Sequence, residues 1–375
     1  MYKKIKAFTN LFDLNRMETE QVKGGNEMGN FYHSTYTKDG FRHIKLNSVN
    51  PDCFRYILKG RSDKVKANLF NNVAKALENQ NLPFSVTCNY DGRITGIKCE
   101  EGRFILCDGT HPFEESALTF GGVDGIIGIE AFQKGNVLKS NGAEIVSIIR
   151  TLSEAERKCT RFLSAAAGVC RDRKRLEKEN ADSRKISRYA AKLWASRGCP
   201  PSGRVGVESK VFFSVPTADG IKCADCDLSR FCDTAIVISG SAGYCSDMII
   251  DRMRRYALSS GIDVISCQSF LDFAGVPDHV IMPALRFGVF RENKNETIAV
   301  SDIKKVRVKR FMQEVPEENT RVRLQFNQRA CDSLMKEVEN VMKKLQRCKK
   351  ELDEIFVEAT DENALFDCVC ARIGL

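Results

Sequence analysis

The chain has 375 residues, of which 43% are hydrophobic and 29% charged, which is typical of a soluble globular protein with about two domains. No apolar stretch reaches the ~20 residues of a membrane-spanning helix, and the N-terminus lacks the apolar core of a signal peptide. The 16 cysteines therefore indicate reduced, packed thiols, and we expect a cytoplasmic protein. The net charge of +9 is modest and does not by itself imply a nucleic-acid partner.

An internal repeat organises the sequence. An Asp-Gly turn at 39–40 recurs at 219–220, and an apolar run that ends at Gly60 recurs with its last residue at Gly240. Both spacings are 180 residues, and two landmarks rarely share one spacing by chance. The sequence therefore predicts a tandem duplication.

Strands and helices alternate within each copy, which predicts an α/β fold with a mostly parallel sheet flanked by helices. In the first copy we expect a strand at 54–59, a helix at 69–77, and strands at 84–88 and 103–107. In the second copy we expect a strand at 234–239, a helix at 248–258, and strands at 264–267 and 286–290.

Each copy ends in a long charged helix followed by a shorter one, which predicts a helical hairpin. In the second copy, apolar residues from Leu334 to Ile355 recur at alternating steps of four and three, as in a heptad seam. The first copy has a looser seam from Leu152 to Val169, followed by the basic run 171–175. The shorter helices are expected at 184–196 and 363–372.

These patterns divide the chain into four parts. We expect an N-terminal extension at 1–29, a first domain at 30–198, a linker at 199–206 and a second domain at 207–375. Each domain is expected to be a P-loop NTPase-like unit followed by its own helical hairpin.

The glycine after the first strand of each copy lies where a phosphate-binding loop, G-x-x-x-x-G-K-[ST], would begin. In such a loop, backbone N–H groups hold phosphate oxygens, the lysine neutralises charge and the hydroxyl binds Mg²⁺. The first copy keeps Gly60 and Lys66, but Val65 replaces the second glycine and Ala67 the hydroxyl residue, and Asp63 adds a carboxylate. The sequence predicts at best weak phosphate binding here.

The second copy is more degraded. It keeps Gly240 and Gly243, but Ser246 replaces the lysine and Asp247 the hydroxyl residue. Asp108, at the end of strand 103–107, is suited to hold Mg²⁺ through water, although an Asp-Gly pair is also a common turn. The candidate nucleotide-binding residues are Gly60, Arg61, Ser62, Lys64, Lys66, Asp108 and Thr110 in the first copy and Gly240, Gly243 and Ser246 in the second.

The order of segments resembles a little-characterised bacterial family of tandem P-loop ATPase-like proteins. The likeness covers roughly residues 30–370 and is carried by Phe54–Leu69, Cys107–Pro112, Gly121–Asp124, Phe213–Gly220, Ile236–Gly243 and Val280–Leu285. The resemblance implies two fused P-loop domains that bind or hydrolyse ATP with Mg²⁺. It matches Gly60 and Lys66 to the first loop, Asp108 to a D-G-T aspartate, and Gly240 and Gly243 to the second loop. The family's second lysine and both magnesium hydroxyls have no counterpart.

Other chemistry has weaker signals. Cys223-x-x-Cys226 with Cys232 is half of a zinc site, but a fourth ligand, such as Cys199 or Cys245, would have to come from a distance, so we expect no metal. His111 either faces the nucleotide pocket or caps a turn. No catalytic residue is identified.

Three functions remain open. The first is nucleotide binding in the first copy, with weak or no ATP hydrolysis. The second is a pseudo-ATPase scaffold that binds a protein partner through its helical hairpins. The third is association with nucleic acid through the basic run 171–175. We expect no ATPase turnover above background.

Overall fold

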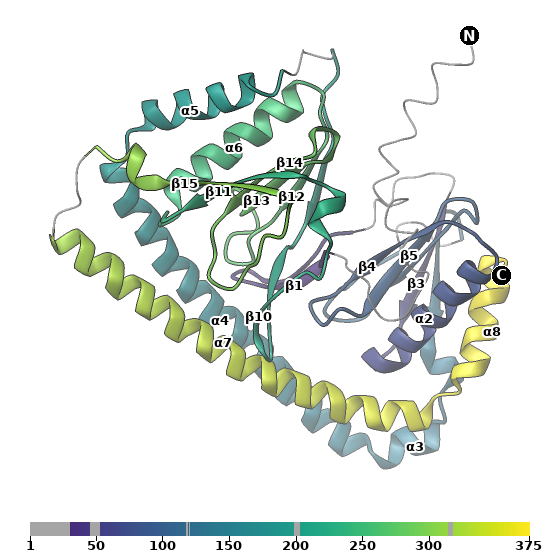
Figure 1. The fold of residues 1–375 in the computed structure, drawn as a ribbon. Coiled ribbons are helices and arrows are strands. Elements are labelled where there is room, and N and C mark those ends of the chain that lie inside the picture. The colour runs from purple at the N-terminus through teal and green to yellow at the C-terminus, as the bar shows by residue number, and fades with distance from the viewer. Residues whose placement is uncertain (1–30, 46–52, 118, 120, 199–202, 314–317) are drawn as a thin grey trace, which may run out of the picture. The chain divides into compact units, whose positions relative to one another are not determined.

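The computed structural model describes residues 31–45, 53–117, 119, 121–198, 203–313 and 318–375. In these residues the chain is a mixed α/β protein with seven α-helices and two larger sheets that contain parallel strands (Figure 1). The chain divides into two compact units. Unit 1 contains the described residues up to Thr35, Phe41–Lys158 and Val341–Leu375, and unit 2 contains Tyr36–Gly40 and Cys159–Asn340.

The sheet of unit 1 has five strands in the order β4-β5-β6-β3-β7. Their bounds are β3 Phe54–Lys59, β4 Phe84–Cys88, β5 Ile94–Cys99, β6 Phe104–Asp108 and β7 Asp124–Gly128. Strand β3 pairs in parallel with β6 and β7, whereas β4, β5 and β6 form an antiparallel meander. The sheet is mixed rather than mostly parallel, because β5 returns between β4 and β6 without a crossover helix.

Helix α2 (Asp63–Asn79) covers this sheet with one apolar face. Every fourth residue of that face is at most 3% exposed, namely Val65, Leu69, Val73 and Leu77. Helix α8 (Glu362–Ile373) packs against α2 and adds Leu365 and Val369 to the same core (Figure 1). The helical spacing of apolar residues therefore decides which face of α2 is buried.

The sheet of unit 2 has six strands in the order β15-β11-β14-β13-β12-β8. Their bounds are β8 Glu208–Val211, β11 Thr234–Ser239, β12 Val264–Cys267, β13 His279–Met282, β14 Phe287–Arg291 and β15 Asp302–Arg307. Strand β11 is parallel to β14 and β15, and β12 is parallel to β8, whereas β13 is antiparallel to both its neighbours. Helices α5 (Ser183–Ala195) and α6 (Tyr244–Ser259) pack side by side in this unit (Figure 1).

The predicted Asp-Gly turns are built alike in the two copies. The first joins β1 (Ser34–Thr37) to β2 (Gly40–His43), and the second joins β9 (Ser214–Thr217) to β10 (Gly220–Cys223). Thr37 Oγ1 donates to the carbonyl of Gly40 at 2.7 Å, and Thr217 Oγ1 donates to that of Gly220 at 2.9 Å. The same hydrogen bond at both turns agrees with a duplicated sequence.

Two long helices supply residues to both units. They are α4 (Gly142–Asn180) and α7 (Glu318–Ala359). Five consecutive positions of the predicted seam on α7 are buried, namely Val338, Val341, Leu345, Cys348 and Leu352, each at most 5% exposed. The remaining helices are short: α3 Gly135–Ser140, η2 Ile129–Phe132, η3 Leu228–Arg230, η4 Pro283–Leu285 and η5 Val308–Phe311.

The compact units differ from the expected ranges 30–198 and 207–375. Helix α5 follows α4 in the chain but belongs to unit 2, and α8 follows α7 but belongs to unit 1. Each short helix thus belongs to the compact unit that contains the sheet of the other copy. A sequence specifies the apolar face of a helix, but it does not specify which of two similar sheets that face covers. The expected extension at 1–29 and most of the expected linker lie outside the described residues.

Candidate functional site

Loop 1, our name for residues Gly60–Ala67, comprises the tight turn that connects β3 to α2 and the first residues of α2. Gly60 has φ +149°, and a Cβ atom there would lie 2.6 Å from Cβ of Ile129, so this position requires glycine. Ser62 is the N-cap of α2, and its Oγ accepts a hydrogen bond from the backbone N–H of Val65 at 3.1 Å. The helix therefore begins at Asp63, and Lys66 lies within its first turn rather than in a loop.

A carboxylate of α7 occupies the start of this helix. Asp353 Oδ1 accepts hydrogen bonds from Ser62 Oγ at 2.7 Å and from the backbone N–H of Lys64 at 3.0 Å. Asp353 is 5% exposed, and the Nη1 of Arg93 lies 3.6 Å from its other oxygen. A helix N-terminus favours an anion because its first N–H groups are free and its dipole is positive there. In unit 1 the protein itself supplies that anion.

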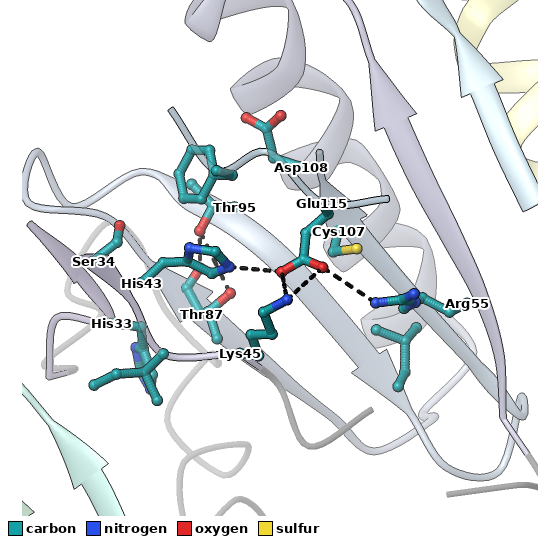
Figure 2. A pocket seen from close by; sticks show the side chains of 13 residues that line it. His33, Ser34, His43, Lys45, Arg55, Thr87, Thr95, Cys107, Asp108 and Glu115 are labelled. Atoms are coloured by element: carbon teal, nitrogen blue, oxygen red, sulfur yellow. Dashed lines mark hydrogen bonds and ion pairs between the residues drawn. The ribbon is translucent and has the colours of Figure 1, made fainter. Parts of the chain in front are cut away.

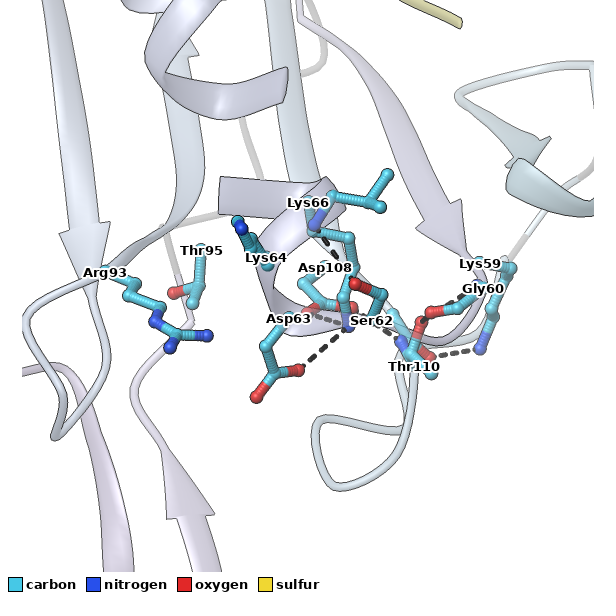
Figure 3. Close-up of polar contacts among 12 residues, drawn as sticks. Lys59, Gly60, Ser62, Asp63, Lys64, Lys66, Arg93, Thr95, Asp108 and Thr110 are labelled. Carbon is cyan, nitrogen blue, oxygen red and sulfur yellow. Dashed lines mark hydrogen bonds and ion pairs between the residues drawn. The ribbon is translucent and has the colours of Figure 1, made fainter. Parts of the chain in front are cut away.

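The lysine of loop 1 is paired inside the protein. Lys66 Nζ lies 2.7 Å from Asp108 Oδ2 and 3.5 Å from Asp63 Oδ1, and the Lys66 side chain is 4% exposed (Figure 3). Asp63 also binds Lys349 of α7 at 2.8 Å. Burial alone would raise the pKa of Asp63, but Lys349 and Lys66 hold it well below its usual range. Lys66 and Lys349 therefore neutralise Asp63 and Asp108.

Thr110 closes loop 1 against the end of β6. Its Oγ1 donates to the carbonyl of Gly60 at 2.8 Å, and its backbone N–H donates to Asp108 Oδ1 at 2.9 Å (Figure 3). Lys59 Nζ donates to the carbonyl of Gly109 close by. The aspartate expected to hold Mg²⁺ thus caps a turn and pairs with Lys66, and Ala67 offers no hydroxyl. These residues do not fit a magnesium–nucleotide complex as they stand.

A cavity of about 30 Å³ remains beside loop 1, which is room for about two water molecules. Its lining includes Arg61, Lys66 and Asp353. His111 also lines it and pairs with Glu156 at 2.9 Å, and this hydrogen bond raises the pKa of His111. Four of the sequence candidates, Arg61, Ser62, Lys66 and Thr110, therefore come together in space around this cavity.

Loop 2 (Gly240–Asp247) connects β11 to α6 and is closed in the same way. Glu177 of α4 accepts hydrogen bonds from the backbone N–H groups of Ala242 at 2.8 Å and Cys245 at 3.0 Å. Ser241 Oγ donates to it at 3.0 Å, as Ser62 Oγ donates to Asp353 in unit 1. Both loops therefore hold a carboxylate from a long helix at the N-terminus of the following helix. We call Asp353 and Glu177 the loop-closing carboxylates.

The other candidates of loop 2 serve the turn itself. Ser246 Oγ donates to the carbonyl of Gly243 at 2.9 Å, and Gly240 and Gly243 adopt φ values of +74° and +129°. Asp247 pairs with Lys174 of α4 at 2.8 Å and with Arg291. Burial raises the pKa of Asp247, and Arg291 and Lys174 partly oppose that rise.

A second polar cluster in unit 1 was not predicted. The carboxylate oxygens of Glu115 lie 2.6 Å from His43 Nε2, 2.8 Å from Lys45 Nζ and 3.3 Å from Arg55 Nη1. Figure 2 shows these contacts. Burial would raise the pKa of Glu115, but the hydrogen bonds from His43 and Lys45 lower it to about 2. Arg55 also binds Asp124 at 2.7 Å. The sequence feature that could have indicated this cluster is Arg55, a charged residue within the apolar run of β3.

Sequence reasoning also missed the loop-closing carboxylates. They lie on long helices that carry many acidic residues, so no spacing distinguishes them.

Of the zinc candidates, Cys223 donates its S–H to the carbonyl of Asn295 at 3.0 Å, and burial raises the pKa of Cys232 to about 11. Within the part of the chain that the structure describes, no three His, Cys, Asp or Glu residues lie close enough to hold a metal ion. Cys199 lies outside that part.

No family model, curated protein or solved structure matches this chain. Among the described helices, none is both long enough and apolar enough to cross a membrane.

Proposed function

We propose that this chain is a tandem P-loop-like protein whose two phosphate loops have become internal carboxylate-binding turns, so that it acts as a pseudo-ATPase scaffold. The observation that carries the proposal is shared by both units: a carboxylate of a long helix accepts the N–H groups that a phosphate would otherwise take. The duplicated spacing of Gly60 and Gly240 supports the same ancestry for both loops.

The local chemistry opposes ATP hydrolysis. Phosphoryl transfer depends on a free lysine, a bound Mg²⁺ and an open helix N-terminus. In unit 1, Lys66 is buried against Asp108, and Asp353 holds the N-terminus of α2. In unit 2, no lysine lies in loop 2, and Glu177 occupies its N–H groups. A nucleotide would have to displace a buried, hydrogen-bonded carboxylate in either unit.

Calorimetry with ATP and ADP, with and without Mg²⁺, tests this proposal. We expect no micromolar binding and no turnover above background for the native chain. Two variants each remove one loop-closing carboxylate. Asp353→Ala frees the N–H of Lys64 in unit 1, and Glu177→Ala frees the N–H groups of Ala242 and Cys245 in unit 2. Micromolar ATP affinity of the native chain that Lys66→Ala abolishes would overturn the scaffold proposal.

Nucleotide binding confined to unit 1 is the second candidate. It is favoured by the lysine that loop 1 retains and by the cavity beside Arg61 and Asp353. This candidate predicts that Asp353→Ala binds ATP at least about tenfold more tightly than the native chain, whereas Glu177→Ala does not. If the two variants bind ATP with equal affinity, this candidate is rejected.

A scaffold requires a partner surface, and α7 offers one in unit 2. Val322 and Phe326 are 59% and 67% exposed and lie one turn apart on the same face. We propose that a protein partner contacts this face of the long helix. A photo-crosslinking residue at position 326 should capture a partner that the same residue at the exposed position 332, about 120° around the helix, does not.

The nucleic-acid hypothesis has less support, because two of the four basic residues in the run 171–175 are paired within the protein. Arg175 binds Asp172 at 3.0 Å and Glu179 at 2.5 Å, and Lys174 binds Asp247 at 2.8 Å. Binding through this run should weaken steeply with salt and on neutralising Arg171, Arg173 and Arg175 together. We expect neither effect.

A further inference from the structure

Two cysteines on different long helices meet in unit 2. Cys170 Sγ of α4 lies 3.6 Å from Cys331 Sγ of α7. Cys331 is 8% exposed, whereas Cys170 is half-buried and can meet a small molecule. Asp172 holds the same two helices together, since Arg323 donates to it at 2.9 Å and Asn327 at 2.7 Å. These contacts fix the register that brings the sulfurs together.

The pair is chemically unequal. The hydrogen bond from Cys331 lowers the pKa of Cys170 to about 7, and the positive charges of Arg173 and Lys174 add to this effect. The same hydrogen bond and burial raise the pKa of Cys331. At neutral pH, about half of Cys170 is therefore thiolate, which is the reactive form, while Cys331 keeps its proton.

We propose that Cys170 and Cys331 form a reversible dithiol–disulfide couple that ties α4 to α7 within unit 2. A low-molecular-weight disulfide is the oxidant. The thiolate of Cys170 attacks one of its sulfurs, which forms a mixed disulfide and releases one thiolate. Cys331 then attacks Cys170 Sγ, its proton passes to the departing second thiolate, and the oxidant is reduced to two thiols.

The geometry requires a small movement. The sulfurs must approach by roughly 1.5 Å to reach an S–S bond of about 2.05 Å. Lys174 and Glu177 follow Cys170 at steps of four and three residues, so all three share one face of α4. The bond would therefore fix the helix segment that holds Glu177 against loop 2. This consequence rests on the proposed function, but formation of the disulfide does not.

Peptide mass spectrometry after equilibration in glutathione buffers tests the couple. In oxidised glutathione, the full chain should yield a peptide pair linked through Cys170 and Cys331, and reduced glutathione should remove the link. Cys223→Ser is the matched control, because Cys223 is also half-buried but burial raises its pKa to about 11. This control should form the link normally, whereas Cys331→Ala should accumulate glutathione on Cys170.

Alkylation rates provide a second readout that does not depend on the disulfide. At pH 7.5, iodoacetamide should modify Cys170 at least about tenfold faster than Cys223. Cys331→Ala should move the midpoint of the Cys170 rate profile above pH 7. Absence of the linked peptide in the native chain, or the same glutathione adduct on Cys170 with and without Cys331, would overturn the proposal. Neither outcome bears on nucleotide binding, so the two proposals fail separately.

Discussion

Lys66 Nζ lies 2.7 Å from Asp108 Oδ2, and both side chains are at most 4% exposed. These are the two residues that the phosphate-loop pattern assigns to a nucleotide and to its magnesium ion. Here they form a buried ion pair that secures α2 to the end of β6. A buried pair that loses one member leaves an uncompensated charge, so such residues affect stability strongly.

The first prediction concerns this pair. Lys66→Met should lower the free energy of unfolding of unit 1 by about 3 kcal/mol, because Asp108 is left buried without its partner. Urea titration followed by hydrogen exchange of unit 1 peptides measures this loss. Lys64→Met, an exposed side chain in the same turn, should change stability by no more than about 0.5 kcal/mol. If both variants are equally stable, Lys66 is not structurally paired.

The second prediction concerns the carboxylate of loop 1. Asp353→Ala removes the acceptor for Ser62 Oγ and for the backbone N–H of Lys64, and it should cost unit 1 about 1–3 kcal/mol. The same urea titration measures it. Glu354→Ala is the matched control, since Glu354 is the next residue on α7 and is exposed. Equal unfolding curves for the two variants would contradict the role assigned to Asp353.

The third prediction concerns loop 2. Glu177→Ala should make the backbone amides of Ala242 and Cys245 exchange at least about tenfold faster, because both donate to Glu177. Fluorescence of Trp194, which lies in unit 2, should show earlier unfolding in urea. Glu179→Ala, on the same helix, removes only a partner of exposed Arg175 and should change neither.

The fourth prediction is a pH dependence in unit 1. The pKa of Glu115 is lowered from 4.5 to about 2 in the folded chain, so the unfolded chain binds its proton more readily. The stability from this group is therefore complete above about pH 4.5 and is lost as the pH falls towards 2, by roughly 3 kcal/mol. Unit 1 of Glu115→Gln should lose less stability between pH 5 and 3 in urea titrations. A parallel loss in both chains would show that Glu115 does not contribute.

The fifth prediction concerns the turn into loop 1. Gly60→Ala should destabilise unit 1 by more than about 1 kcal/mol, because its φ of +149° is unfavourable and its Cβ would meet Ile129. Gly135→Ala is the control, since a Cβ there has nothing within 4 Å. Thermal unfolding compares the two. If Gly60→Ala leaves the unfolding temperature unchanged, the turn can relax to accept the added Cβ.

Much of the secondary structure could be predicted. The strand expected at 84–88 is β4, the strand at 264–267 is β12, and the helices expected at 69–77 and 248–258 lie inside α2 and α6. Apolar runs and helical periodicity are local properties, so they survive without tertiary information. Strand β5 was missed because Ile94–Cys99 mixes glycine, threonine and lysine with its apolar residues.

The sequence by itself determined the 180-residue spacing of the repeated landmarks, the glycine turns and the absence of a complete phosphate-loop motif after either glycine. Only the tertiary structure decided which groups accept the N–H groups at the start of α2 and α6. Asp353 is 291 positions from Ser62, and Glu177 is 65 from Ala242, so no local pattern links either carboxylate to its loop. A helix N-terminus favours an anion whichever molecule supplies it, and in the folded chain two of the many carboxylates on the long helices take that place.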